Sequence, residues 1–329
     1  MRCLALAEAW QDAGGEALFL TQQLPPSLVR RLKSENAEVI PLVSEPGSLQ
    51  DAAEALSYVN RLGSSWVVVD GYHFGASYQK QMKASGASLL FLDDNGHAGE
   101  YVADIVLNYN FHASERFYQN RLAHTELLLG TKYLLLRREF LKWKDRKHLS
   151  ERKKGLRLLV TFGGSDLENL TCRAVRALDF VHSNPLEVEV VIGATYPHRS
   201  ELEALVKKSH FPVSVKTQVT DFSEIMARSD LALSAGGVSC CELAFMGVPT
   251  LVIVAADNQR LAAQAIHEKG VGYSLGWWER VREAQIGEAL NQLVQDEKGR
   301  ARISAIQRQL VDGEGAARVV KAIQERIPQ

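Results

Sequence analysis

Residues 231–254 read LALSAGGVSCCELAFMGVPTLVIV, and this stretch decides the fold. Two short apolar runs, 231–234 and 250–255, have the length of buried strands, and the second is rich in β-branched residues. Between them, Ser239 is a good N-cap with Glu242 three residues later, and a Gly-x-Pro sequence ends the helix. The stretch therefore predicts a strand, a glycine turn, a short helix and a second strand.

The glycine turn at Gly236 and Gly237 predicts an anion site. Glycine lets the backbone come close to a ligand, and the first N–H groups of a helix attract negative charge. A phosphate or diphosphate is the natural occupant. Each backbone N–H bound to a charged oxygen contributes roughly 1.5–3 kcal/mol, so a few of them hold a nucleotide without a metal. A tight turn without a ligand is the alternative.

The rest of the chain alternates strands with helices, which is typical of parallel, doubly wound sheets. The expected strands are 17–21, 38–43, 66–70, 88–92, 102–108, 156–162, 187–192 and 213–217, with helices between most of them and three more after about 281. The segment 142–154 is dense in Lys and Arg, which favours a solvated linker over a nucleic-acid patch. We therefore expect a first domain at 1–141, a linker at 142–155 and a second domain at 156–329.

Composition limits the function classes. The net charge of −1 over 329 residues argues against a broad nucleic-acid surface. The four cysteines show no metal-ligand spacing, and no apolar run is long enough to span a membrane. We expect a cytoplasmic monomer with no metal, no cofactor, no nucleic-acid partner and no integral membrane segment.

Several spaced motifs carry a family resemblance. The Gly-Gly turn, Ser-x-x-Glu, Gly-x-Pro and the later Asn258-Gln259 resemble the donor half of the two-domain GT-B enzymes, the class of the glycosyltransferase MurG. The segments 161–166 (TFGGSD), 130–140 (GTKYLLLRREF) and 69–72 (VDGY) narrow this to the PseG family of UDP-sugar hydrolases and its SpsG-like relatives. The resemblance implies two Rossmann-type domains that face a cleft.

The beginning of the chain departs from the family pattern. In the family, a strand and a Gly-x-Gly-His-x-x-Arg loop precede the helix that opens this sequence, and Arg2 matches the arginine of that loop. We therefore expect the first strand of domain 1 and the general-base histidine to be missing, and the first half to be loosely folded. His73 and His97 lie in loops, where lone histidines are more often incidental than general bases.

The resemblance and the positions after strands give the candidate site residues. Tyr72 resembles an active-site tyrosine of the hydrolase, and the alternative is that it lies in a turn without a role in the site. Asp93 and Asp94 end another strand. The resemblance assigns Glu242 to the ribose hydroxyls, since a carboxylate accepts hydrogen bonds and donates none. The amide of Asn258 suits a sugar hydroxyl, or only caps a helix. The expected catalytic residues are Tyr72 and Asn258, and the expected substrate and UDP contacts are Gly163, Gly164, Ser165, Asp166, Ile192, Gly193, Val219, Ser234, Gly236, Gly237, Ser239, Glu242, Asn258 and Gln259.

The implied function is hydrolysis of a UDP-activated diacetamido-trideoxy sugar to free sugar and UDP, as in pseudaminic acid biosynthesis. Water would attack the anomeric carbon with inversion, and UDP would leave. Without the family's histidine, activity of this chain is in question. The alternatives are a GT-B glycosyltransferase that uses a UDP-sugar donor and a nucleotide-sugar binder without catalysis.

Overall fold

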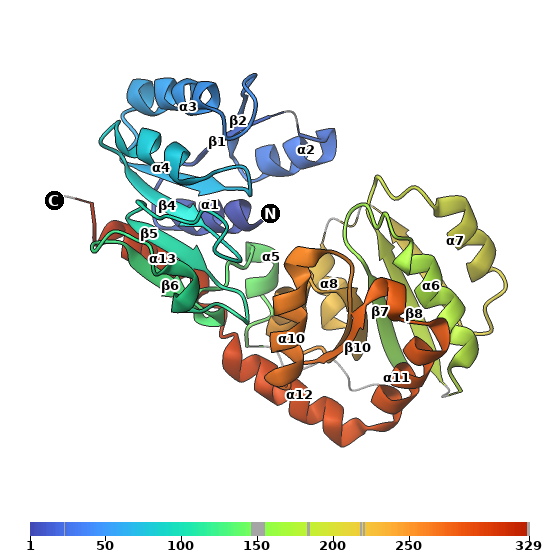
Figure 1. Ribbon diagram of the computed structural model, residues 1–329. Coiled ribbons are helices and arrows are strands. Elements are labelled where there is room, and N and C mark those ends of the chain that lie inside the picture. Colours follow the sequence, from blue (N-terminus) through green and yellow to red (C-terminus); the bar gives the residue numbers. More distant parts are fainter. Residues whose placement is uncertain (23, 146–154, 183–184, 218, 220, 328–329) are drawn as a thin grey trace. The chain divides into compact units, whose positions relative to one another are not determined.

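The computed structural model describes residues 1–329 except 23, 146–154, 183–184, 218, 220 and 328–329 (Figure 1). The chain divides into two compact units: unit 1 is Met1–Arg138 with Gly313–Gln329, and unit 2 is Glu139–Asp312. The sequence placed residues 313–329 in the second domain, whereas they belong to unit 1. Most of the predicted linker, from 146 to 154, lies outside the described residues.

Unit 2 is built on a single parallel sheet of six strands in the order β12-β11-β10-β7-β8-β9. Because the chain moves outward from β7 on one side and from β10 on the other, the winding reverses between these two neighbours. The strands are β7 (Leu156–Thr161), β8 (Leu186–Ile192), β9 (Val213–Thr217), β10 (Leu231–Ala235), β11 (Thr250–Val254) and β12 (Tyr273–Trp277). In a doubly wound sheet, ligands bind beyond the carboxyl ends of the strands at such a reversal.

The helices of unit 2 pack in two groups, as a doubly wound sheet requires (Figure 1). One group is α6 (Leu170–Ala177), α7 (Arg199–Val206) and α11 (Glu283–Gln295), and the other is α8 (Phe222–Ala227), α9 (Ser239–Met246) and α12 (Glu297–Leu310). A further helix, α10 (Arg260–Glu268), contacts β11 and β12.

The core of unit 2 includes the segment 231–254, and its burial explains why the sequence pattern of that segment is so clear. Every residue of β10 and β11 is buried, as is every residue of α9 after Ser239. Burying a large apolar side chain contributes about 1.5–3 kcal/mol, so three adjacent apolar elements hold the glycine turn between them firmly. The sequence did not predict β12, because Gly276 interrupts its short apolar pattern.

Unit 1 contains two separate parallel sheets. One has the two strands β1 (Leu18–Thr21) and β2 (Glu38–Pro41), and the other has four strands in the order β3-β4-β5-β6. The four are β3 (Trp66–Asp70), β4 (Ser88–Leu92), β5 (Ile105–Asn108) and β6 (Glu126–Leu129), and only β6 was not predicted. The helices between them are α2 (Pro26–Ser34), α3 (Leu49–Leu62) and α4 (Ala76–Lys83).

The first and last helices of the chain pack together in unit 1. The chain opens with α1 (Arg2–Asp12), as the sequence predicted, and α13 (Gly315–Gln324) contacts it. Glycine at 315 lets the start of α13 lie against the backbone of residues 133–134, since a Cβ there would lie 2.3 Å from the carbonyl oxygen of Leu134. Arg318 donates to the carbonyl of Lys132 at 2.7 Å, and Arg326 pairs with Glu126 at 2.5 Å. Residues 313–329 therefore complete unit 1. The short helix α5 (Arg138–Leu141) lies at the boundary between the units.

Candidate functional site

Two glycine turns leave neighbouring strands at the point where the winding of unit 2 reverses. Strands β7 and β10 pair in parallel, with Thr161 opposite Ser234, so the turns that follow them start at the same edge of the sheet. Gly163 and Gly164 follow β7, and Gly236 and Gly237 follow β10. This arrangement places both predicted loops where open α/β sheets bind ligands.

The turn after β10 is open on one side. Gly236 is buried, and a Cβ on it would lie 3.1 Å from the Cβ of Gln259. Gly237 is exposed, and a Cβ on it would meet no atom within 4 Å. The backbone at Gly237 is therefore accessible to a ligand, whereas Gly236 is packed against its neighbours.

The helix after this turn begins without a side-chain cap, which corrects one prediction. Ser239 is the first residue of α9 rather than its N-cap, and Val238 at the cap position already has helical dihedrals. The predicted Ser-x-x-Glu capping box does not form. Within the described part of the chain, the first α9 bonds come from the amides of Cys240 and Cys241, and no acceptor faces those of Gly237, Val238 and Ser239.

These uncapped amides have a chemical consequence. The first N–H groups of a helix lack acceptors within the helix and carry part of its positive dipole. A side-chain cap would have neutralised them, as Asp221 does at α8 by accepting from the amide of Glu224 at 3.1 Å. At α9 they stay available to an anion.

Gln259 joins the glycine turn to the segment after β11. Its side-chain oxygen accepts from the amide of Gly236 at 3.2 Å and from that of Ala255 at 2.9 Å. Asn258 and Gln259 lie in a 3-10 helix (Asp257–Gln259) that leads directly into α10, with Gln259 at its N-cap position. The side-chain oxygen of Gln259 thus joins the backbone of the glycine turn to the residue after β11.

Two other predicted contacts of this stretch lie inside the protein. Ser234 is 1% exposed within β10, two residues before the glycine turn. Glu242, on the first turn of α9, is 8% exposed. Carboxylates are rarely so buried without a structural or binding role.

The loop after β7 has three exposed residues followed by a buried one. Gly163, Gly164 and Ser165 are exposed. Asp166 is buried, and its carboxylate accepts from the amides of Leu170 and Thr171 at 2.9 and 2.8 Å, which caps α6. Burial raises the pKa of this carboxyl in spite of those hydrogen bonds. Asp166 therefore holds the loop, and only the three residues before it are placed to contact a ligand.

Three of the expected UDP contacts, Ile192, Gly193 and Val219, differ in their surroundings. Ile192 is 3% exposed in β8 and belongs to the core, so its side chain lines no pocket. Val219 is half-buried. Gly193 packs so tightly against the glycine loop that a Cβ on it would lie 1.9 Å from the carbonyl oxygen of Gly164.

Gly193→Ala should therefore disturb the glycine loop. The added methyl group has no room against backbone, so the segment 163–165 must move. Overpacking of this kind costs about 1–3 kcal/mol, and we expect a lower melting temperature together with weaker nucleotide binding. Thermal unfolding and calorimetric titration check both. Unchanged values for both would show that the two backbones do not pack as described.

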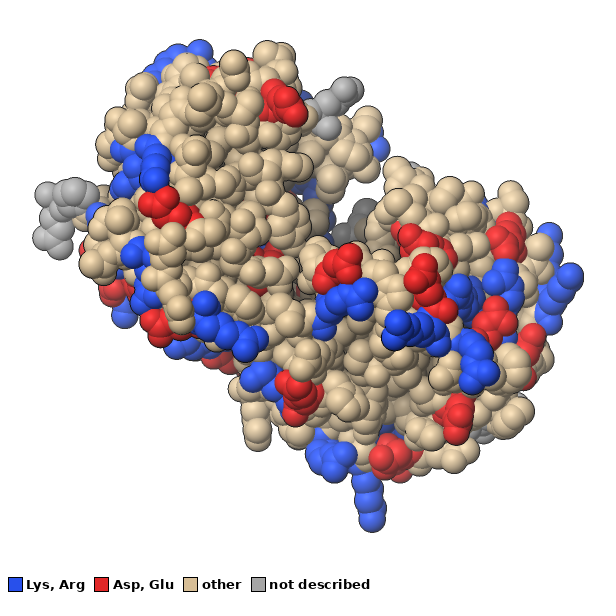
Figure 2. All heavy atoms as spheres, viewed as in Figure 1, with Lys and Arg blue, Asp and Glu red and all other residues tan. Residues whose placement is uncertain are grey.

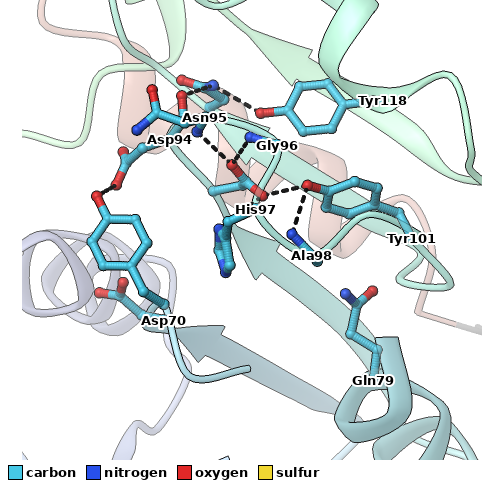
Figure 3. Close-up of polar contacts among 12 residues, drawn as sticks. Asp70, Gln79, Asp94, Asn95, Gly96, His97, Ala98, Tyr101 and Tyr118 are labelled. Carbon is cyan, nitrogen blue, oxygen red and sulfur yellow. Dashed lines mark hydrogen bonds and ion pairs between the residues drawn. The ribbon is translucent and has the colours of Figure 1, made fainter. Parts of the chain in front are cut away.

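Unit 1 has a polar cluster at the carboxyl ends of its strands (Figure 3). The hydroxyl of Tyr72 donates to Asp94 at 2.7 Å. Arg2, at the start of α1, donates to Asp70 at 2.6 Å and to Asp94 at 2.7 Å. The thiol of Cys3 donates to Asp70 at 3.0 Å. Burial would raise the pKa of Asp70, but the hydrogen bonds and charge of Arg2 outweigh burial and lower it.

Two asparagines at the end of β5, Asn108 and Asn110, complete this cluster, and sequence reasoning gave them no role. Asn110 donates to Asp94 at 2.7 Å, and Asn108 donates to the Asp94 carbonyl and to the hydroxyl of Tyr118, both at 2.8 Å. The signal that could have found them is the Asn-x-Asn sequence directly after an apolar strand. Tyr72 remains half-exposed in this setting.

Comparison with known proteins shows what the chain is similar to. Residues 158–321 match the glycosyltransferase family 28 C-terminal domain. The chain is 28% identical over 244 residues to the spore coat polysaccharide biosynthesis protein SpsG of Bacillus subtilis, covering 73% of this chain and 70% of that protein. It is 24% identical over 211 residues to a Helicobacter pylori protein named as a pseudaminic acid cytidylyltransferase and UDP-2,4-diacetamido-2,4,6-trideoxy-β-L-altropyranose hydrolase, covering 64% and 37%.

The chain is an SpsG- and PseG-like protein of the GT-B class. It is also 25% identical over 265 residues, 79% of its length, to the uncharacterized protein MJ1062 of Methanocaldococcus jannaschii. It spans about half, 53%, of that relative.

Solved structures show the fold. MurG of Acinetobacter baumannii superposes with a TM-score of 0.70 at 17% identity, over 98% of this chain and 95% of that one. Anabaena HepE, solved in complex with UDP-glucose, gives 0.65 at 13% identity, over 99% and 95%. The SpsG- and PseG-like chain thus has the two-domain, Rossmann-like GT-B fold.

The surface and the cysteines add two observations. On the face shown in Figure 2, Lys and Arg alternate with Asp and Glu, and no broad patch of one sign forms. All four cysteines are free, and three of them are buried. In the described part of the chain, no helix has the length and apolarity to cross a membrane.

Proposed function

We propose that this chain binds a UDP-sugar at the glycine turns of unit 2 and, when joined to the family's Gly-x-Gly-His segment, hydrolyses it to free sugar and UDP. The observation that carries the proposal is the pair of exposed glycine turns at the strand reversal, with three uncapped amides at the start of α9. The likeness to a Helicobacter pylori protein whose name includes a UDP-sugar hydrolase supports the choice of substrate class and reaction.

The amides of Gly237, Val238 and Ser239 would bind the diphosphate. Each charge-assisted backbone hydrogen bond contributes roughly 1.5–3 kcal/mol, and the helix dipole adds about 0.3–1 kcal/mol. Negative charge on the diphosphate grows as the bond to the sugar breaks, so the same groups stabilise the leaving group. This chemistry requires no metal, and the proposal includes none.

The other proposed contacts follow from position. Glu242, one turn into α9, would accept hydrogen bonds from the two ribose hydroxyls. The exposed Gly163–Ser165 loop would contact the diphosphate or the sugar, and Asn258, which is exposed, would contact a sugar hydroxyl. Tyr72 in unit 1 is the proposed catalytic contact. The proton acceptor in the family is the histidine of a Gly-x-Gly-His loop, and the proposal assigns that role to no residue of this chain.

The test separates binding from turnover. We expect residues 1–329 to bind UDP, as measured by calorimetry, and a chain extended by a family Gly-x-Gly-His segment to release UDP from a UDP-diacetamido-trideoxy sugar. UDP-glucose serves as the control for sugar selection. The proposed hydrolysis is wrong if the extended chain binds UDP but releases none from any such sugar.

A glycosyltransferase is the second candidate, and the match to the family 28 C-terminal domain favours it. In that reaction an acceptor hydroxyl replaces water. Product masses measured with and without added sugar acceptors decide between the two, because a transferase gains a larger product only when the acceptor is present.

A further inference from the structure

A buried carboxylate organises the loop after β4. Asp93 is 1% exposed, and its Oδ1 accepts from the amides of Asn95 and Gly96, both at 2.7 Å. Its Oδ2 accepts from the hydroxyl of Tyr101 at 2.6 Å (Figure 3). A buried charge is stable only with such partners, so Asp93 fixes the conformation of residues 93–97.

His97 connects this carboxylate to the loop that carries Tyr72. Its Nδ1 lies 3.2 Å from Asp93 Oδ2, and both ring nitrogens are shielded from solvent. The ring packs edge-on against Tyr72, with centroids 5.3 Å apart, and lies tilted against Phe91 of β4, with centroids 5.6 Å apart. The backbone of Phe74, two residues after Tyr72, also lies close to the imidazole.

We propose that His97 is a positioning residue for Tyr72: paired with Asp93, it holds the segment 71–75 so that the Tyr72 hydroxyl stays on Asp94. The inference rests on the proposed function of Tyr72 and concerns how that residue is controlled. His97 itself has no solvent-accessible nitrogen with which to act on a substrate. Its effect therefore passes through the aromatic contact and the loop backbone.

The charges around His97 make this positioning dependent on pH. Asp93 and Asp94 face the ring from the β4 loop, and Phe74 presents its carbonyl. Burial lowers the pKa of His97, but the hydrogen bond and charge of Asp93 outweigh it and raise the pKa. Burial raises the pKa of Asp93, and its bonds to His97 and Tyr101 outweigh that and lower it.

The sign of the pH dependence follows. A histidine with a raised folded pKa stabilises its surroundings fully below its unfolded pKa of about 6.5, and that contribution is lost as pH rises through the folded pKa. The segment 71–75 should thus loosen on the alkaline side. Each unit by which the pKa is raised corresponds to about a tenfold change in the local opening equilibrium.

Hydrogen exchange of the amides 71–75, corrected for the intrinsic rate, tests this without any need for turnover. We expect protection to fall by about threefold to tenfold between pH near 6 and pH near 9. His97→Gln keeps a neutral donor for Asp93 and should abolish that pH dependence. His210→Gln is the matched control, because His210 forms an exposed pair with Asp179 at 3.8 Å in unit 2, and it should change nothing in this segment.

Two outcomes would overturn the proposal. One is pH-independent protection of 71–75 in the unsubstituted chain, and the other is the same pH dependence in His97→Gln. If turnover is measurable in the extended chain, kcat of the unsubstituted protein should fall at alkaline pH. In His97→Gln this fall should disappear, while KM for the UDP-sugar changes little. If exchange behaves as expected but no UDP is released, His97 still positions the loop, and only the proposed reaction is wrong.

Discussion

Gly237→Ala should weaken UDP binding by about tenfold to a hundredfold without lowering stability. A Cβ at this position meets no protein atom within 4 Å, so the methyl group would occupy only the space proposed for the diphosphate. Losing one charge-assisted hydrogen bond of roughly 1.5–3 kcal/mol corresponds to that change in Kd. Titration calorimetry with UDP measures the affinity, and thermal unfolding measures the stability.

Gly75→Ala provides the matched control. A Cβ at Gly75 in unit 1 also meets nothing within 4 Å, and both glycines have dihedrals that alanine accepts. This substitution should leave UDP binding unchanged. Equal affinities for Gly237→Ala and the unsubstituted chain would show that the diphosphate lies elsewhere.

Arg2→Met should destabilise unit 1 strongly. The arginine side chain is 13% exposed and lies between Asp70 and Asp94, so its loss leaves two carboxylates close together without their cation. Removing one partner of a buried ion pair typically costs 3–5 kcal/mol. For a domain of this size, that corresponds to a fall of about 6–20 °C in the melting temperature of unit 1.

The stabilisation of unit 1 by the Arg2–Asp70 ion pair depends on pH in a definite direction. Arg2 lowers the pKa of Asp70, so the stabilisation is present above the unfolded pKa of about 3.9 and is lost as pH falls through the folded pKa. Arg2→Met should remove this acid sensitivity. Arg61→Met, which removes an exposed arginine from α3 of the same unit, should change stability by no more than about 0.5 kcal/mol. A melting curve for Arg2→Met that matches the Arg61→Met control would contradict the ion-pair assignment.

Much of the fold could be predicted from sequence because its signals are local. Strand β10, the glycine turn, α9 and β11 follow one another within 24 residues, and each has a distinct apolar or turn pattern. The capping of α9 could not be predicted in the same way. Ser239 and Glu242 match a capping pattern, but the helix begins one residue earlier in its dihedrals, at Val238, and leaves Ser239 inside the first turn.

The parts that could not be predicted depend on contacts between distant residues. Arg2 and Asp94 are separated by 92 positions, and no spacing rule joins them. Asp166 was expected to contact the ligand because it ends a glycine loop. Both of its carboxylate oxygens instead accept hydrogen bonds from the first amides of α6. Strand β6 (Glu126–Leu129) pairs with β5, whose residues lie 21 positions earlier in the chain.

The central claim is that the amides before and at the start of α9 bind the leaving nucleotide. Backbone amide NMR of the isotope-labelled chain, titrated with UDP, tests it most directly. The account predicts that the resonances of Gly237, Val238 and Ser239 shift most and exchange more slowly with solvent when UDP is bound. Saturable UDP binding that leaves residues 236–242 unperturbed while shifting amides elsewhere would contradict it.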